Sequence, residues 1–143
     1  MLAIIFSIIA GASMSFQGVM NTRLSEKMGL YEATAFVTGF AFILSLIAIW
    51  LVGNGNFKAI LEVNKLYWLA GILGIIITIT VMLGIKGQSP TVAISIILIA
   101  QVLVAALIDA FGLFGTDKLY FHWTHFLGLA LMIGGVIVFK LRS

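Results

Sequence analysis

Two amide side chains interrupt the first hydrophobic stretch of the sequence at helical spacing. Gln17 and Asn21 are four residues apart and follow the apolar run that begins MLAIIFSIIAG. Because helical residues advance by about 100° each, the two amides share an arc of roughly 120° with Ser7 and Gly11. A carboxamide both donates and accepts hydrogen bonds, so this face is suited to bind a neutral polar group.

The fourth hydrophobic stretch repeats this pattern. Read as a helix, it places Thr91, Ser95, Gln101 and Asp109 on one arc of roughly 120°. Polar groups that face lipid are costly, so both faces should look into a helix bundle or a water-filled cavity. They could join helices by hydrogen bonds or line a solute pathway, and the number of polar groups favours the pathway. The predicted substrate-binding residues are Gln17, Asn21, Ser95 and Gln101.

Ionisable side chains occur near the ends of the hydrophobic stretches. Asp109 lies near the far end of the fourth stretch, within reach of interfacial water. It is a candidate residue for coupling or gating, and the simpler alternative is a carboxylate that caps the following turn. His122 and His125 flank Trp123, but no third ligand accompanies them. We therefore expect an interfacial position for both histidines, and neither a metal site nor a cofactor.

No set of catalytic residues is apparent. The chain has no cysteine, no HExxH helix and no serine, histidine and aspartate in a supporting motif. The glycine-containing run GASMSFQG lacks the GK[ST] of a phosphate-binding loop and lies within an apolar stretch. The positive residues are scattered singly, which argues against nucleic acid as a partner. We expect that the protein is not an enzyme.

The composition indicates that these residues lie on helices that cross a lipid bilayer. Of the 143 residues, 62% are hydrophobic and only 9% are charged, with a mean hydropathy of +1.22. A soluble domain carries roughly 25% charged residues, so lipid must be the solvent. Crossing the hydrocarbon core takes about 20 apolar residues in a helix. Five stretches qualify, at about 2–21, 32–52, 67–85, 90–110 and 121–139.

The sequence predicts an all-α, polytopic membrane protein with one five-helix domain over residues 1–143. A closed barrel would need alternating apolar and polar residues, and ISIILIAQVLVAAL does not alternate. Ser89 is suited to cap the fourth helix and Pro90 to its first position. Small residues at helical spacing let helices approach closely in membranes. The predicted helix-packing residues are Gly71, Gly74, Gly128 and Gly135.

Five spans place the two termini on opposite sides of the membrane. One side receives five positive residues, Arg23, Lys27, Lys86, Lys140 and Arg142, and the other receives three, Lys58, Lys65 and Lys118. The positive-inside rule then predicts a cytoplasmic C-terminus. Because the difference is small, insertion in both orientations stays an alternative.

Several of these residues also occur in a known pattern. The spacing of Gln17 and Asn21, and of Gln101, Asp109, Phe111 and Gly112 in QVLVAALIDAFGLFG, resembles the YdcZ-type family of five-helix inner-membrane proteins. That family is a branch of the drug/metabolite transporter superfamily. The likeness covers nearly the whole chain. Two positions depart from the family pattern: Ala110 stands where a histidine is common, and Ala100 where a glycine is common.

The resemblance implies half of an inverted-repeat transporter in the inner membrane of a prokaryote. Such a chain would pair in antiparallel fashion with itself or with a sister five-helix chain, and an odd number of spans is what this arrangement requires. The expected partners are lipid and a small organic solute. Related small multidrug resistance proteins carry a buried glutamate in the first helix, where this chain offers Gln17. The alternative is a non-transporting subunit that assembles with or regulates another membrane protein.

Overall fold

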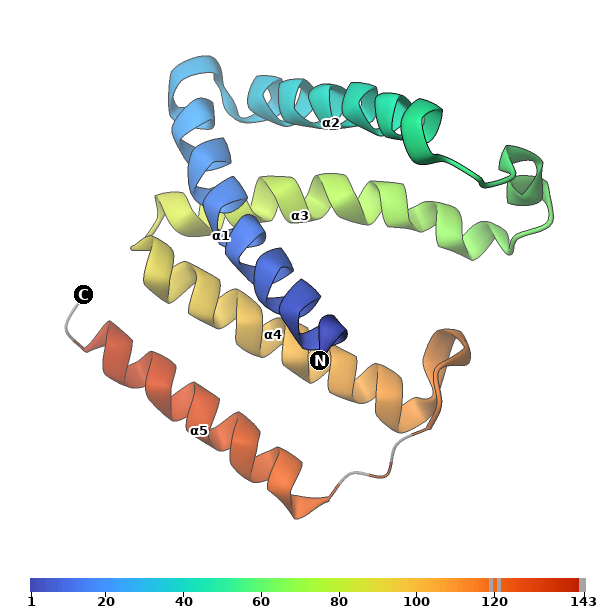
Figure 1. Ribbon diagram of the computed structural model, residues 1–143. Coiled ribbons are helices and arrows are strands. Elements are labelled where there is room, and N and C mark those ends of the chain that lie inside the picture. The colour runs from blue at the N-terminus through green and yellow to red at the C-terminus, as the bar shows by residue number, and fades with distance from the viewer. Residues whose placement is uncertain (119, 121, 142–143) are drawn as a thin grey trace. The chain divides into compact units, whose positions relative to one another are not determined.

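The computed structural model describes residues 1–118, 120 and 122–141, and all their regular structure is helical. The long helices are α1 (Leu2–Met28), α2 (Leu30–Val52), α3 (Leu69–Lys86), α4 (Pro90–Phe111) and α5 (Trp123–Lys140) (Figure 1). Short 3₁₀ helices η1 (Phe57–Leu61), η2 (Lys65–Trp68) and η3 (Leu113–Gly115) lie in the connections. Five helices in this described part of the chain are long and apolar enough to cross a membrane, which confirms the predicted all-α, polytopic fold class.

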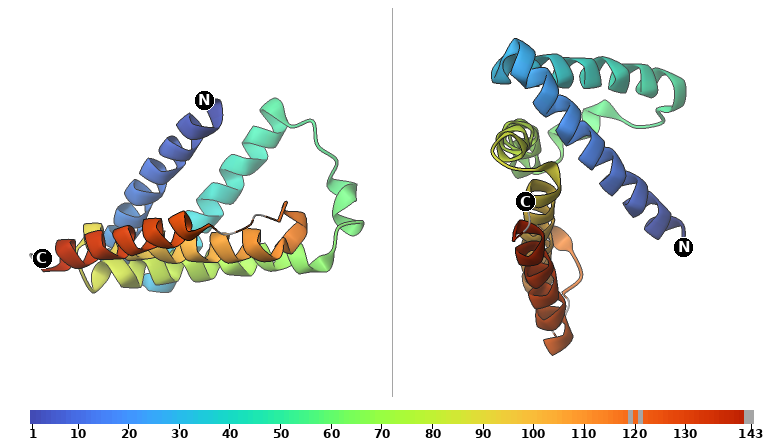
Figure 2. Two further views of the ribbon diagram at one scale, coloured as in Figure 1. Left: turned by 90° about the horizontal axis from the view of Figure 1, so that it is seen from below. Right: turned by 90° about the vertical axis from the view of Figure 1, so that its left-hand side faces the viewer.

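The chain divides into two compact units, Met1–Lys86 and Gly87–Ser143. In the first unit α1 contacts both α2 and α3, and α2 also contacts α3. In the second unit α4 packs against α5, and the two helices run alongside each other in opposite directions (Figures 1 and 2). The predicted start of the fifth span at residue 121 lies outside the described residues, and so does Arg142.

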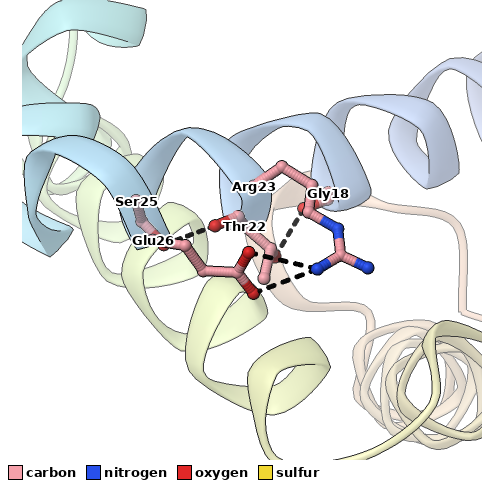
Figure 3. Close-up of polar contacts among 5 residues, drawn as sticks. All are labelled: Gly18, Thr22, Arg23, Ser25 and Glu26. Atoms are coloured by element: carbon pink, nitrogen blue, oxygen red, sulfur yellow. Dashed lines mark hydrogen bonds and ion pairs between the residues drawn. The ribbon is translucent and has the colours of Figure 1, made fainter.

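Helix α1 runs on to Met28 instead of ending near residue 21. Four polar residues of this extension, Thr22, Arg23, Ser25 and Glu26, find partners within the helix. Arg23 pairs with Glu26 one turn later, with the guanidinium Nη1 3.1 Å from the carboxylate Oε2 (Figure 3). At 1.5 Å per residue, the 27 residues of α1 span about 40 Å, more than the hydrocarbon core requires. The C-terminal turns of α1 are therefore long enough to extend into the membrane interface.

One glycine forms the whole connection between α1 and α2. Gly29 has φ 101° and ψ 156°, a backbone conformation that is essentially restricted to glycine. Its N–H donates to the carbonyl oxygen of Ser25 at 3.1 Å, and its own carbonyl accepts from Ala33 at 3.1 Å. The last turn of α1 and the first turn of α2 thus share this residue. The segment predicted as a longer loop is helical on both sides of Gly29.

The ends of α4 follow from local sequence. Pro90 occupies the start of the helix, as predicted, and its fixed φ suits that position. Ser89 precedes it as the capping residue, although its side chain makes no capping hydrogen bond. At the other end Gly112 adopts the left-handed conformation with φ 63°. Its N–H donates to the carbonyl oxygen of Asp109 at 3.4 Å, which closes the helix.

Few residues are buried within the chain itself. The buried apolar residues among those described are Ala33, Met82, Ile85, Val92 and Ala93. Large apolar side chains on all five spanning helices remain exposed. For helices that lie in a bilayer, such a surface is covered by lipid or by other chains, so the small internal core does not imply a marginal fold.

Candidate functional site

The second half of α1 carries a buried polar face. Gly18, Asn21, Thr22 and Ser25 are its buried residues, and their spacing places them on one side of the helix. Three of the four have a polar side chain. A run of polar groups away from lipid is the expected position for residues that bind a solute or another helix. The three polar side chains differ in whether they form hydrogen bonds within the chain.

Gly18 brings the backbone of α1 close to α3. A Cβ atom at this position would lie 3.1 Å from both Ile85 Cδ1 and Val81 Cγ1. These separations are tighter than most Cβ contacts, so the absence of a side chain is what allows the approach. Gly11, one heptad earlier, has nothing within 4 Å of a Cβ built there. The close contact between α1 and α3 is therefore confined to the second half of α1.

The hydroxyls of this face are already engaged by their own helix. Thr22 Oγ1 donates to the carbonyl oxygen of Gly18 at 2.8 Å (Figure 3). Ser25 Oγ donates to the carbonyl oxygen of Thr22 at 2.7 Å. Each hydroxyl has one proton, so neither keeps a donor for a solute. These two residues let a polar segment pack inside the fold, and no feature of the sequence analysis had identified them.

Asn21 is different, because its carboxamide has no such partner. The residue is 8% exposed, and in the part of the chain that the structure describes no hydrogen bond involves its side chain. All fully buried side-chain polar atoms there do have partners, so the Asn21 amide keeps an accessible edge. Leaving such a group without hydrogen bonds costs about 1–3 kcal/mol. Asn21 therefore offers two donors and an acceptor to whatever reaches that edge.

Gln17 lies one turn before Asn21 but is exposed. Ser7, on the same predicted face, is exposed as well, and its hydroxyl donates to the carbonyl oxygen of Ala3 at 2.9 Å. The structure thus divides the predicted polar face of α1 into an open first half and a buried second half. Gln17 stands at the boundary between the two halves.

The predicted polar residues of α4 lie in the second unit. Ser95 is half-buried and Gln101 is exposed. Asp109, in the last turn of the helix, is half-buried, and its carboxylate makes no ion pair among the described residues. A negative charge at a helix C-terminus is disfavoured by the helix dipole, so Asp109 is not placed there for the stability of α4. The role of these three residues in binding or coupling stays a prediction.

The four predicted packing glycines share one property. A Cβ at any of them would meet nothing within 4 Å. Within each unit taken by itself, no described helix approaches these glycines as α3 approaches Gly18, so their faces are open there. The residues are Gly71, Gly74, Gly128 and Gly135.

The two histidines help to form the start of α5. His122 is the residue before the helix, and its backbone N–H donates to Nδ1 of His125 at 3.2 Å. This is the helix-capping geometry in which a side chain in the first turn satisfies the backbone before it. Among the described residues no group of three histidine, cysteine or carboxylate side chains could hold a metal ion.

The comparison with protein families identifies the chain. A family model described as "Putative inner membrane exporter, YdcZ" matches residues 2–138. The chain belongs to the YdcZ family. No curated protein and no solved structure matches it. The match confirms the resemblance that Gln17, Asn21, Gln101 and Asp109 had indicated.

Membership in the YdcZ family indicates that the candidate site lies in the inner membrane. With five membrane-spanning helices in an exporter family, the protein is a multi-pass inner-membrane protein with a transporter-like role. The buried amide of Asn21 then lies in a helix that crosses the membrane or in its interfacial end.

Proposed function

We propose that this YdcZ-family chain is a secondary transporter subunit that moves a small organic solute across the inner membrane. The observation that carries the proposal is the buried Asn21 carboxamide, which has no hydrogen-bond partner among the residues that the structure describes. An amide that only joined helices would bond to a neighbouring helix, and the described residues offer Asn21 no such bond. An amide that stays unsatisfied, yet accessible, is suited to exchange water for the polar groups of a solute.

The proposed transporter is an antiparallel dimer of this chain or of this chain with a sister chain. Support comes from the odd number of spans, because two copies in opposite orientations then form an inverted repeat. The open faces around the packing glycines supply surfaces on which a second chain can pack closely. Gln17, Asn21, Ser95 and Gln101 of both chains would line a shared cavity, with access alternating between the two sides.

The proposed binding chemistry is neutral. Gln17 and Asn21 provide hydrogen bonds without charge, so the favoured solutes are neutral or zwitterionic. If transport is coupled to protons, Asp109 is the proposed coupling residue, since it is a half-buried carboxylate on a spanning helix. No covalent chemistry is part of the proposal, and the chain acts as a carrier and not as an enzyme.

The test is solute uptake into liposomes containing the purified protein, with a broad panel of polar organic solutes. Asn21→Leu removes the amide at similar size, and we expect a loss of uptake of about tenfold, the effect of one strong substrate hydrogen bond. Thr22→Val is the matched control, because the Thr22 hydroxyl lies next to Asn21 in the sequence but already donates to the carbonyl oxygen of Gly18 in α1. Cross-linking in the same liposomes reports the dimer.

Three results would contradict the proposal. Folded dimers that transport nothing across the panel would favour a non-transporting subunit. Loss of dimers in Asn21→Leu, together with loss of uptake, would assign the amide to the contact between chains. Full uptake by Asn21→Leu would remove Asn21 from the pathway.

A further inference from the structure

The connection between α2 and α3 is ordered by its own residues. It spans residues 53–68 and contains η1 and η2, and we call it the connecting segment. Asn56 precedes η1, and its side-chain oxygen accepts from the N–H of Lys58 at 3.0 Å. Asn64 precedes η2 and accepts from the N–H of Leu66 at 3.0 Å. Both turns are thus formed by local caps and not by packing under another helix.

The apolar side chains of this segment are left uncovered. Phe57 is 70% exposed, Ile60 51% and Leu61 82%. Val63 and Leu66 also count among the exposed hydrophobic residues. A connection in water is normally polar, and uncovered apolar residues gathered in one short segment mark an interaction surface.

The two ends of the segment indicate what covers it. The segment leaves α2 just after the exposed Trp50 and enters α3 through the exposed Tyr67 and Trp68. Aromatic residues of this kind lie at the boundary between headgroups and acyl chains. Along the chain, the exposed apolar residues of the segment therefore follow directly on exposed aromatic residues at the ends of both spanning helices that it joins.

The charges of the segment also suit contact with lipid. Lys58 and Lys65 bracket the single carboxylate, Glu62, so the segment carries a net positive charge. Apolar residues with interspersed lysines are typical of segments that lie in the plane of the membrane interface. The lysine stems can follow the apolar surface while the ammonium groups reach lipid phosphates.

We propose that the connecting segment lies in the membrane interface, with Phe57, Ile60 and Leu61 inserted between acyl chains and the two lysines at lipid phosphates. The occupant of this surface is phospholipid of the bilayer that α2 and α3 cross. The segment would then hold the ends of these two helices at a fixed depth. This inference rests on the membrane location of the chain and is independent of what the chain transports.

Because the chain has no cysteine, a single introduced cysteine gives one labelled position. The test attaches a nitroxide spin label at Leu61→Cys in liposomes of phosphatidylethanolamine and phosphatidylglycerol. Collisions with oxygen, which concentrates in lipid, are compared with collisions with a water-soluble nickel complex. Ile72→Cys on the exposed face of α3 is the lipid reference, and Glu62→Cys is the adjacent water reference.

We expect oxygen collisions to exceed nickel collisions at Leu61, as at Ile72, with the opposite ratio at Glu62. Nickel accessibility at Leu61 equal to that at Glu62 would place the segment in water and overturn the proposal. Protection from both reagents would mean that protein covers the surface. Spectral broadening that disappears when labelled chains are diluted with unlabelled ones would identify a second copy as the partner. Either result would also overturn it.

A second arm tests the lysines. The label at Leu61 should lie deeper in vesicles containing phosphatidylglycerol than in vesicles of phosphatidylcholine alone. The double substitution Lys58→Gln and Lys65→Gln should abolish that difference, while circular dichroism shows unchanged helix content. Equal depths in both vesicles with the lysines present would contradict their assignment to lipid phosphates.

Discussion

Gly18 of α1 lies so close to Ile85 of α3 that a Cβ atom on the glycine would be 3.1 Å from Ile85 Cδ1. Ile85 is itself buried, and so is Met82 one turn before it. This contact fixes the second half of α1 on α3 and leaves Asn21, one turn further along α1, in a buried position.

The contact predicts a strong effect of side-chain size at residue 18. Gly18→Leu should lower the free energy of unfolding by about 1–3 kcal/mol, because the added atoms force α1 away from α3. Gly11→Leu is the matched control, since a side chain there has open space. Unfolding by sodium dodecyl sulfate, followed by circular dichroism, measures both. Equal effects of the two substitutions would contradict the close approach of α1 and α3.

Replacing Gly29 should destabilise the fold. Its φ of 101° and ψ of 156° exclude side chains, and a Cβ there would also collide with the Glu32 carboxylate. We expect Gly29→Ala to destabilise the fold by about 1–3 kcal/mol. Gly39→Ala, within α2 and with open space around it, should be neutral or slightly stabilising.

A double variant separates the two causes. In Gly29→Ala combined with Glu32→Ala the collision is gone but the backbone conformation is still required. Most of the destabilisation should therefore persist. Full recovery of the unfolding midpoint would show that the side-chain collision, and not the backbone, makes glycine necessary.

Asn21→Leu should not destabilise the protein. Because the Asn21 amide has no hydrogen-bond partner in the described chain, replacing it by an apolar side chain removes an unsatisfied polar group. The free energy of unfolding should stay the same or rise by about 1 kcal/mol. The same detergent titration measures it, with Thr22→Val as control. A loss of more than about 1 kcal/mol would mean that the amide bonds to another helix.

The charge distribution predicts the orientation of the chain. Arg23 and Lys27, near the end of α1, and Lys86, at the end of α3, lie on the same predicted side as the C-terminus. A C-terminal reporter should therefore be active in the cytoplasm. Two C-terminal reporter fusions give the readout, one with a reporter that is active only in the cytoplasm and one with a reporter that is active only in the periplasm. Activity of both would establish dual insertion, and activity in the periplasm alone would reverse the predicted orientation.

The sequence predicts the spans well because the cost of placing polar groups in lipid is a local property of each stretch. The end of α1 is harder to predict, since Thr22 and Ser25 look like loop residues until their hydroxyls are seen to bond within the helix. The one-residue connection at Gly29 depends on a backbone conformation that no residue pattern specifies.

The candidate site shows the same limit. Helical spacing places Gln17 and Asn21 on one face of α1, and the structure keeps them one turn apart. Spacing alone does not distinguish the buried amide from the exposed one. That difference depends on α3, whose Ile85 meets α1 at Gly18, and so on a contact between residues distant in the sequence.

The one-residue connection at Gly29 also has a mechanical consequence. Any change in the angle between α1 and α2 must come from the two backbone torsions of that residue, because the helical hydrogen bonds on either side reach it directly. A rotation of α1 is therefore transmitted almost completely to α2. The first two helices would therefore move as a single body, together with the part of α3 that Gly18 contacts.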